Sequence, residues 1–392
     1  MTNPLHIRAI LGELPDEMLK VVGPSEFASG RYPLERCVLD LRTFAAPLTE
    51  ALRQLPFAGF LADAPDILDH HHNAIYIPCD AVGTVGPGDV IEVLPTRSQI
   101  AVRYRRGENG NLLFTTERCN NYCLMCSQPP RDVADEWRVA QLRQLVELIE
   151  PDEPDLAISG GEPTLLGEAL ADLVQHCSEH LPQTRLHILS NGRHLSAPGY
   201  AARFDGIHPL LSWGIPLYGA NHSLHDYVVQ AKGAFAETIN GIYAAARASQ
   251  HIEIRIVLVK PVVEHLRSLA NYICRNLPFV EHVALMGTEP IGFAKAHQPD
   301  LWIDPMDANE AMAEAIELLD ASGMAVSIYN VPLCVLKDEI RGYARDSISH
   351  WKRTFLPACE SCSLKDRCAG FFSWITPAWT SRGISPVKLE VM

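Results

Sequence analysis

The sequence has no long apolar run, and this absence limits what the protein can be. No stretch of about 18 uninterrupted apolar residues occurs, so a membrane-spanning helix is not expected. Residues 1–6 lack the basic segment followed by an apolar stretch that a secretion signal requires. We therefore expect a cytoplasmic protein without a membrane partner.

Basic residues are also scarce. Lys and Arg number 33 against 47 Asp and Glu, which gives a formal net charge of −14. Because phosphate backbones are bound by basic surfaces that release counterions, this balance disfavours nucleic acid as a partner. Hydrophobic residues make up 47% of the 392 residues, and no internal repeat or low-complexity tract is present. This composition is typical of a globular protein with a sizeable core and argues against intrinsic disorder.

Beyond about residue 126, short apolar runs alternate with stretches of helical periodicity. Such alternation predicts βα units around a parallel sheet. We expect about six units, fewer than the eight of a closed barrel. The fold class is therefore α/β, with a partial (βα)6 TIM-like barrel. Its later strands are expected at residues 156–159, 186–189, 210–215, 254–259, 283–286 and 325–329.

The first 110 residues have a different pattern, in which glycine and proline near position 86 interrupt short β-prone runs. This predicts a small, mostly β domain without further βα units. The expected organisation is thus an N-terminal β-rich domain at residues 1–110, the barrel at 111–330, and a cysteine-rich module at 331–392.

Eleven cysteines in a chain without a secretion signal favour metal or cluster ligation over a disulfide framework. Two groups stand out by their spacing, C-x3-C-x2-C and C-x2-C-x5-C. The first consists of Cys119, Cys123 and Cys126, and the second of Cys359, Cys362 and Cys368, with Cys334 shortly before it. We expect two metal sites and four structural thiols, Cys37, Cys79, Cys177 and Cys274.

The first group supplies three thiolates, whereas a structural zinc site has four ligands. If the metal is a cubane of four irons, each thiolate holds one iron, and the fourth iron can take an exogenous ligand. Zinc remains the alternative, because spacing alone does not separate the two.

Polar motifs follow the next two predicted strands. The first is Ser159-Gly160-Gly161-Glu162-Pro163, and the second is Ser190-Asn191-Gly192. Parallel strands present ligands at their carboxyl edge, where glycine lets a backbone approach closely. Glu162 suits an ammonium group, and Ser190 with Asn191 suits a ribose. We expect these motifs and the three cysteines to share one mouth.

Together these three motifs resemble the radical S-adenosylmethionine (SAM) enzymes over roughly residues 114–329. The resemblance implies that Cys119, Cys123 and Cys126 hold a [4Fe-4S] cluster whose open iron chelates the methionine moiety of SAM. Reduction, by a partner such as flavodoxin or ferredoxin, would cleave SAM and give a 5′-deoxyadenosyl radical that abstracts hydrogen. The implied SAM contacts are Gly160, Gly161, Glu162 and Pro163 at the methionine end and Ser190 and Asn191 at the ribose.

One position departs from the family pattern. The family prefers an aromatic residue just before the third cysteine, and this chain has Met125 there. A methionine can still pack on the face of an adenine ring.

The second cysteine group resembles the cysteine trio of the auxiliary-cluster domains found on peptide-modifying members of this superfamily. The longer version of that motif has a fourth cysteine where this chain has Phe372, so we predict Cys334 as the fourth ligand. The resemblance implies a second, auxiliary [4Fe-4S] cluster. A structural zinc site built from the same four thiolates is the alternative.

More narrowly, residues 118–130 and 368–372 resemble a radical SAM maturase of the His-Xaa-Ser peptide system. This implies a ribosomally made precursor peptide as substrate and a sister radical SAM maturase as partner. Two rivals stay open: a radical SAM enzyme acting on a small molecule or on tRNA, and a non-catalytic, zinc-stabilised binding protein.

Three further polar residues have two interpretations each. His225 and Asp226 can assist proton transfer or can cap a turn. Arg255 on a buried strand needs a partner, either a carboxylate of SAM or substrate or an internal salt bridge. The sequence identifies no general acid or base.

Overall fold

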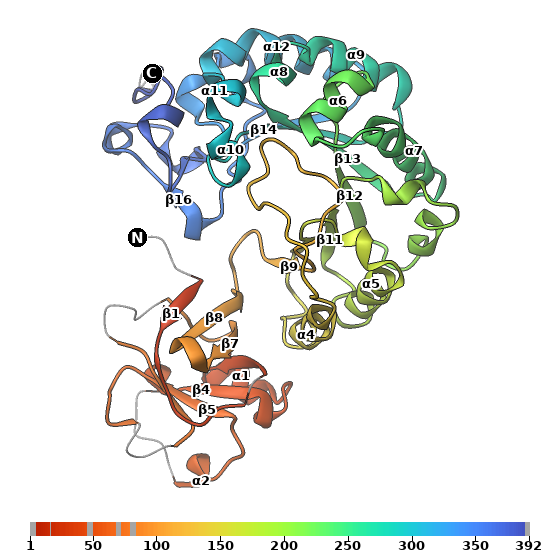
Figure 1. Ribbon diagram of the computed structural model, residues 1–392. Coiled ribbons are helices and arrows are strands. Elements are labelled where there is room, and N and C mark those ends of the chain that lie inside the picture. Colours follow the sequence, from red (N-terminus) through yellow and green to blue (C-terminus); the bar gives the residue numbers. More distant parts are fainter. Residues whose placement is uncertain (1–4, 16, 45–49, 68–71, 79–83, 389–392) are drawn as a thin grey trace.

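The computed structural model describes residues 5–15, 17–44, 50–67, 72–78 and 84–388. Two sheets form its framework. An N-terminal sheet of eight strands adjoins a sheet of seven strands, which is surrounded by an arch of helices (Figure 1). The C-terminal segment lies beside α10 (Phe293–Ala296) and α11 (Gln298–Leu301), where the Gln298 side chain donates to the Ala378 carbonyl oxygen at 2.9 Å.

The seven-stranded sheet is parallel throughout, and its strands follow chain order. Of the six strands before the last one, five are followed by an α-helix; β11 is followed only by the 3-10 turns His194–Ser196 and Ala201–Phe204, so the structure has one βα unit fewer than the six that the sequence predicts. β9 and β15 are its two edges, so the barrel is open. The strands are β9 (Leu112–Phe114), β10 (Asp155–Ser159), β11 (Arg185–Leu189), β12 (Leu211–Pro216), β13 (His251–Leu258), β14 (His282–Gly287) and β15 (Ala325–Tyr329).

Helices cover the outer face of this sheet because each presents an apolar stripe to it. In α5, Leu170, Leu173, Val174 and Cys177 are spaced i, i+3, i+4, i+7, and all four are buried. The covering helices are α4 (Trp137–Val146), α5 (Glu168–His180), α6 (His222–Val229), α7 (Ala234–Arg247), α8 (Lys260–Val263), α9 (Leu266–Asn276), α10 (Phe293–Ala296), α11 (Gln298–Leu301) and α12 (Pro305–Ala321).

The strands alternate between buried apolar side chains and less buried polar ones. In β13, Ile252, Ile254 and Ile256 are buried against the helices, whereas Glu253 and Arg255 point to the other face. The inside of the open barrel is therefore polar, and its wall is apolar.

The N-terminal sheet has the strand order β1-β8-β7-β3-β4-β5-β6-β2. β1 and β2 are the two ends of this order, where β1 pairs with β8 and β2 pairs with β6, although only Ala9 separates β1 from β2 in the sequence. The sheet therefore curls almost into a closed barrel around its own apolar core. Its strands are β1 (His6–Arg8), β2 (Ile10–Leu11), β3 (Met18–Val22), β4 (Cys37–Asp40), β5 (Gly59–Ala62), β6 (Ala74–Tyr76), β7 (Val90–Leu94) and β8 (Gln99–Tyr104).

The prediction that this part has no βα units is wrong. Strands β3, β4, β5 and β6 are parallel, and the crossovers contain α1 (Pro24–Ser29) and α2 (Glu50–Arg53). These helices have six and four residues, too few to produce a readable helical period in the sequence.

A buried lysine connects the two sheets. Lys20 of β3 is fully buried, and its Nζ donates to the carbonyl oxygens of Gly88 (2.7 Å) and Leu148 (2.8 Å). It also lies 3.0 Å from the Glu150 carboxylate. Burial lowers the pKa of Lys20, and the charge of Glu150 opposes this change. The apolar core runs continuously from β3 and β4 to α4, so the N-terminal part packs firmly on the barrel.

The C-terminal part contains little regular structure: α13 (Asp338–Arg341) and the antiparallel pair β16 (Arg353–Thr354) and β17 (Phe371–Phe372). Before this pair, the Tyr343 carbonyl and the Arg345 amide hydrogen-bond to Ile328 on the free side of β15, both at 2.9 Å. Among the described residues, no helix is long and apolar enough to cross a membrane.

Candidate active site at the carboxyl edge of the barrel

The segment after β9, residues 115–131, carries the first three cysteines and is called the cysteine loop below. Backbone hydrogen bonds fix it to neighbouring elements: Tyr122 and Leu124 donate to carbonyl oxygens at the end of α6, at 3.0 and 2.9 Å. The Cys126 carbonyl accepts from the Phe293 amide at 2.8 Å. The loop therefore has a defined shape that sets the positions of its thiols.

The three thiols are half-buried and influence one another. Burial, and the negative charges of Glu162 and Cys126, raise the pKa of Cys119 to about 11. Burial also raises the pKa of Cys123 and of Cys126, and in Cys123 the neighbouring thiols add to the rise. Since only thiolates ligate metal, binding at this site must release protons.

Thiol spacing distinguishes the two metal hypotheses. Among the described residues, the one group of three metal-ligating side chains within 4.8 Å of one another is Glu147, His176 and His180 on α4 and α5, which includes no cysteine. Thiolates around one zinc at about 2.3 Å must lie about 3.8 Å apart. The thiols of Cys119, Cys123 and Cys126 are thus not gathered as they would be around one zinc ion, whereas a cluster, in which each thiolate holds a different iron, keeps its ligands farther apart.

The two glycines after β10 allow the cysteine loop to approach. A Cβ at Gly161 would lie 2.2 Å from the Arg118 carbonyl oxygen, and one at Gly160 would lie 2.6 Å from that of Thr116. The Gly161 amide donates to the Thr116 oxygen at 2.6 Å. In this structure the close backbone approach predicted for these glycines is made by the cysteine loop.

Glu162 is fully buried and connects the ends of two strands. Its Oε1 accepts from the Thr164 amide (3.0 Å), the Thr164 hydroxyl (2.6 Å) and the Ser190 hydroxyl (2.7 Å), and its Oε2 accepts from the Asn191 amide (2.6 Å). Pro163 is buried at the start of the short turn Pro163–Leu166. The motifs after β10 and β11 therefore meet, as the sequence predicts.

The second motif also holds the cysteine loop. The Asn191 Nδ2 donates to Asn120 Oδ1 at 2.6 Å. Arg193 donates from Nη1 to the Asn120 carbonyl at 2.5 Å and to Asn121 Oδ1 at 2.7 Å. Sequence reasoning missed Arg193, although a basic residue directly after a predicted strand-end motif was a usable signal. Met125 is buried in the main core at the base of the same loop.

Arg255 finds its partner inside the barrel. Its Nη1 donates to Glu253 Oε1 at 2.6 Å, while His282 contacts Glu253 Oε2 at 2.6 Å. Burial acts to raise the pKa of Glu253, but hydrogen bonds from His187 and His282 and the charge of Arg255 hold it well below its usual range. Of the two interpretations of Arg255, the structure shows the internal salt bridge.

The pair His225 and Asp226 separates into two roles. Asp226 accepts from the backbone amides of Gly233 (2.6 Å) and Phe235 (2.8 Å), so it caps the turn into α7. His225 is buried, which lowers its pKa to about 4, and its Nδ1 accepts from the Tyr218 amide at 3.3 Å. A histidine with this pKa is neutral near pH 7. Burial and the charge of Cys123 raise the pKa of Tyr218, a residue that the sequence did not single out.

The structure brings the C-terminal cysteines together as well. Cys334, Cys359, Cys362 and Cys368 line one small cavity. Burial and the neighbouring thiols raise the pKa of both Cys334 and Cys359. The amides of Leu333 and Gly370 approach the Cys368 sulfur at 3.4 and 3.5 Å. As in the cysteine loop, no three of these thiols lie within 4.8 Å of one another.

The cysteines expected to be structural have no such grouping in the described part of the chain. Cys37 and Cys177 are buried, and Cys274 is half-buried against the core. Cys79 lies outside the described residues.

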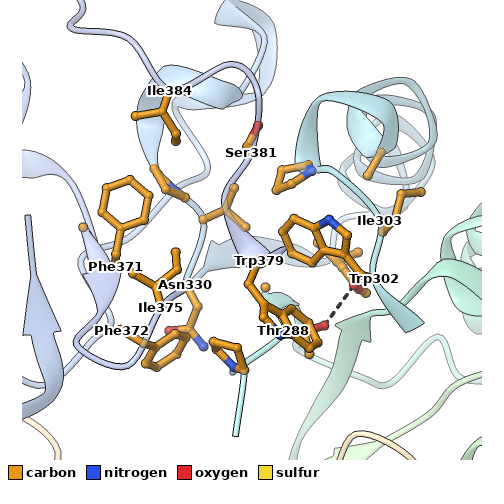
Figure 2. Close-up of a pocket in the computed structure, with 18 residues that line it drawn as sticks. Thr288, Trp302, Ile303, Asn330, Phe371, Phe372, Ile375, Trp379, Ser381 and Ile384 are labelled. Carbon is orange, nitrogen blue, oxygen red and sulfur yellow. Dashed lines mark hydrogen bonds between the residues drawn. The ribbon is translucent and has the colours of Figure 1, made fainter. Parts of the chain in front are cut away.

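An aromatic pocket joins the C-terminal module to the barrel (Figure 2). Trp302 and Trp379 meet edge to face with ring centroids 5.2 Å apart, and Thr288 Oγ1 donates to the Leu258 carbonyl at 3.1 Å on the barrel side. The pocket shares three lining residues, Pro332, Phe371 and Ile384, with the cavity of the four cysteines. The module is therefore packed against the carboxyl ends of β13 to β15.

Three solved structures resemble this chain at low identity. SuiB of Streptococcus suis bound to S-adenosylmethionine has 14% identity and a TM-score of 0.44 over 55% of this chain and 49% of that chain. Native anSMEcpe with bound AdoMet has 17% identity and a TM-score of 0.43, over 55% and 62%. A radical SAM methyltransferase from Sphaerobacter thermophilus has 18% identity and a TM-score of 0.39, over 62% and 69%. The chain thus spans about half the length of SuiB.

A family model matches the part of the chain that contains the cysteine loop and both strand-end motifs. The match covers residues 113–273 and is to the Radical SAM superfamily. No curated protein sequence matches the chain. The matched residues form most of the open barrel described above, and this part of the chain is a radical SAM domain.

Proposed function

We propose that this protein is a peptide maturase that modifies a ribosomally made precursor peptide of the His-Xaa-Ser type. A radical SAM domain implies an enzyme with a [4Fe-4S] cluster and SAM as cofactors. When bound, these groups supply reductive cleavage of SAM to methionine and a 5′-deoxyadenosyl radical that abstracts a hydrogen atom. The electron would come from a reductant such as flavodoxin or ferredoxin.

We assign the cluster to Cys119, Cys123 and Cys126 because their thiols are not gathered as around one zinc ion. Met125 and the strand ends at Gly160, Gly161, Glu162, Pro163, Ser190 and Asn191 are assigned to SAM. The side chains of Glu162, Ser190 and Asn191 already bond to one another and to the cysteine loop. Their contribution to SAM binding is therefore to hold the loop and the two strand ends in one fixed arrangement.

The observation that carries the peptide assignment is an open groove beside this mouth, called the edge groove below. Its walls come from β8, from β9 with α4, and from Ser349, Trp351 and Lys352. It reaches the cysteine loop at Glu117 and Gln128, two residues beyond Cys126. A long groove open to solvent suits an extended chain, whereas a small molecule is usually enclosed by its pocket.

We assign an auxiliary [4Fe-4S] cluster to Cys334, Cys359, Cys362 and Cys368. Its supporting observations are the shared cavity, the thiols that are not gathered as around one zinc ion, and the packing against the barrel. The proposal also includes the three-part organisation with boundaries near residues 110 and 330, and a sister radical SAM maturase as partner.

The test is an anaerobic reaction of the reconstituted protein with SAM, dithionite and a synthetic peptide containing His-Xaa-Ser repeats. We expect 5′-deoxyadenosine to form and the mass of the peptide to change. A parallel reaction with tRNA provides the comparison. Modification of tRNA in place of the peptide, or 5′-deoxyadenosine without any change in the peptide, would contradict the peptide assignment.

A further inference from the structure

The barrel has a free strand edge inside the edge groove. β9 pairs with β10 through alternate residues: the Asn111 carbonyl accepts from Ala157 at 3.0 Å, and the Thr115 amide donates to Ser159 at 2.7 Å. The residues between them, Leu112 and Phe114, must direct their backbone N–H and C=O groups away from β10. Among the described residues, these four groups have no hydrogen-bond partner.

This edge faces the groove directly. Leu112 is 40% exposed, and Leu112 and Phe114 both line the groove, whereas Leu113 between them is buried in the core. On α4, Trp137 is 52% exposed and stacks with Arg138, whose guanidinium lies 4.8 Å from the indole centroid. Unpaired strand edges of this kind attract an added strand.

The space beside β9 is where the sheet stops short of closure. The far edge, β15, is already paired at Ile328 by Tyr343 and Arg345, and the chain then continues to the groove wall at residues 349–352. β9 has no corresponding neighbour on its outer side in the described chain. One extended segment between β9 and that wall would satisfy the four free backbone groups.

The charge of the groove indicates the chemistry of this segment. Four of the five basic residues in its lining already pair with carboxylates: Arg103 with Glu92, Arg105 with Asp89, Arg138 with Glu117 and Lys352 with Glu289. The fifth, Arg97, is exposed and has no ion-pair partner among the described residues. An acidic segment is therefore favoured over a basic one.

We propose that the free edge of β9 binds an extended, acidic segment of the peptide substrate as an additional strand of the barrel sheet. Leu112 and Phe114 would exchange backbone hydrogen bonds with it, and Arg97 would attract its acidic side chains. Because β9 leads directly into the cysteine loop, one end of the bound segment lies at the mouth. This inference rests on the proposed peptide substrate and names the place where it is held.

The test uses the full-length protein and a fluorescein-labelled synthetic peptide in which an acidic flank precedes His-Xaa-Ser repeats. Leu112→Pro removes the outward N–H without touching the bonds to β10, since an edge strand tolerates proline on its free side. Leu112→Ala removes the same side chain but keeps the N–H, and it is the matched control. We expect Leu112→Pro to weaken binding at least about tenfold and Leu112→Ala less than about threefold.

Hydrogen exchange of the wild-type protein gives a second readout that does not depend on the variant folding. The amides of Leu112 and Phe114 should become protected when the peptide is added. Equal binding by the two variants, or bound peptide without protection at these amides, would overturn the edge proposal and leave the peptide function intact. No binding to the wild type would overturn the proposed function itself. A wild-type dimer that Leu112→Pro dissociates would make a second copy of this chain the occupant and would also overturn the proposal.

Discussion

Removing the Glu162 carboxylate should loosen the barrel mouth even without cofactors. In Glu162→Ala the backbone N–H groups of Thr164 and Asn191 lose their hydrogen-bond acceptor in a fully buried position. The hydroxyl groups of Thr164 and Ser190 also lose it, but they can rotate toward other partners. A hydrogen bond to a charged group contributes about 1.5–3 kcal/mol, so the loss of two such bonds should lower the free energy of unfolding by about 3–6 kcal/mol. Glu162→Gln keeps Oε1 but turns an NH2 group toward the Asn191 amide, and it should lose about 1.5–3 kcal/mol.

The assay is urea denaturation of the metal-free protein, because bound cofactors would add their own stabilisation. Glu168→Ala is the control: this carboxylate is 76% exposed and pairs with Arg203 on the surface, so its loss should change stability by about 0.5 kcal/mol or less. If Glu162→Ala and Glu168→Ala unfold at the same urea concentration, the argument that Glu162 connects the two strand ends is wrong.

Two further predictions concern the same mouth. Gly161→Ala would place a Cβ 2.2 Å from the Arg118 carbonyl oxygen and displace the cysteine loop, so the reconstituted variant should hold less iron than the wild type. The control is Gly342→Ala, whose Cβ meets nothing within 4 Å, and equal iron in the two variants would contradict the prediction. The pKa of His225 is about 4 in the folded protein and about 6.5 in the unfolded chain. The neutral, buried imidazole therefore contributes its full stabilisation above pH 6.5, and the free energy of unfolding decreases by about 3 kcal/mol in total as the pH falls toward 4. In urea titrations His225→Gln should show a weaker loss of stability than the wild type over this pH range, and identical pH profiles would refute the assignment.

The barrel could be predicted from the sequence because its elements are regular. The apolar stripe of α5 and the alternation of buried and exposed residues in β13 are local patterns. That the two strand-end motifs lie at one edge of the sheet follows from the order of the parallel strands along the chain. The βα units of the N-terminal sheet were missed because α1 and α2 are too short to show a period.

Other features depend on tertiary contacts that spacing does not encode. Arg193 bonds to Asn120 and Asn121, more than 70 positions away in the chain. Glu162 was identified as a functional carboxylate, yet its hydrogen-bond partners on β11 could not be predicted. The free edge of β9 likewise becomes visible only when the strand order is known.

The most direct test of the central claim is the iron, zinc and sulfide content of anaerobically prepared protein, with electron paramagnetic resonance of the reduced protein before and after SAM is added. We predict about eight irons per chain, little zinc and a spectrum that SAM changes. Replacing Cys119, Cys123 and Cys126 together by alanine should leave about four irons and abolish the effect of SAM. Zinc without iron, or a spectrum that SAM leaves unchanged, would contradict the account.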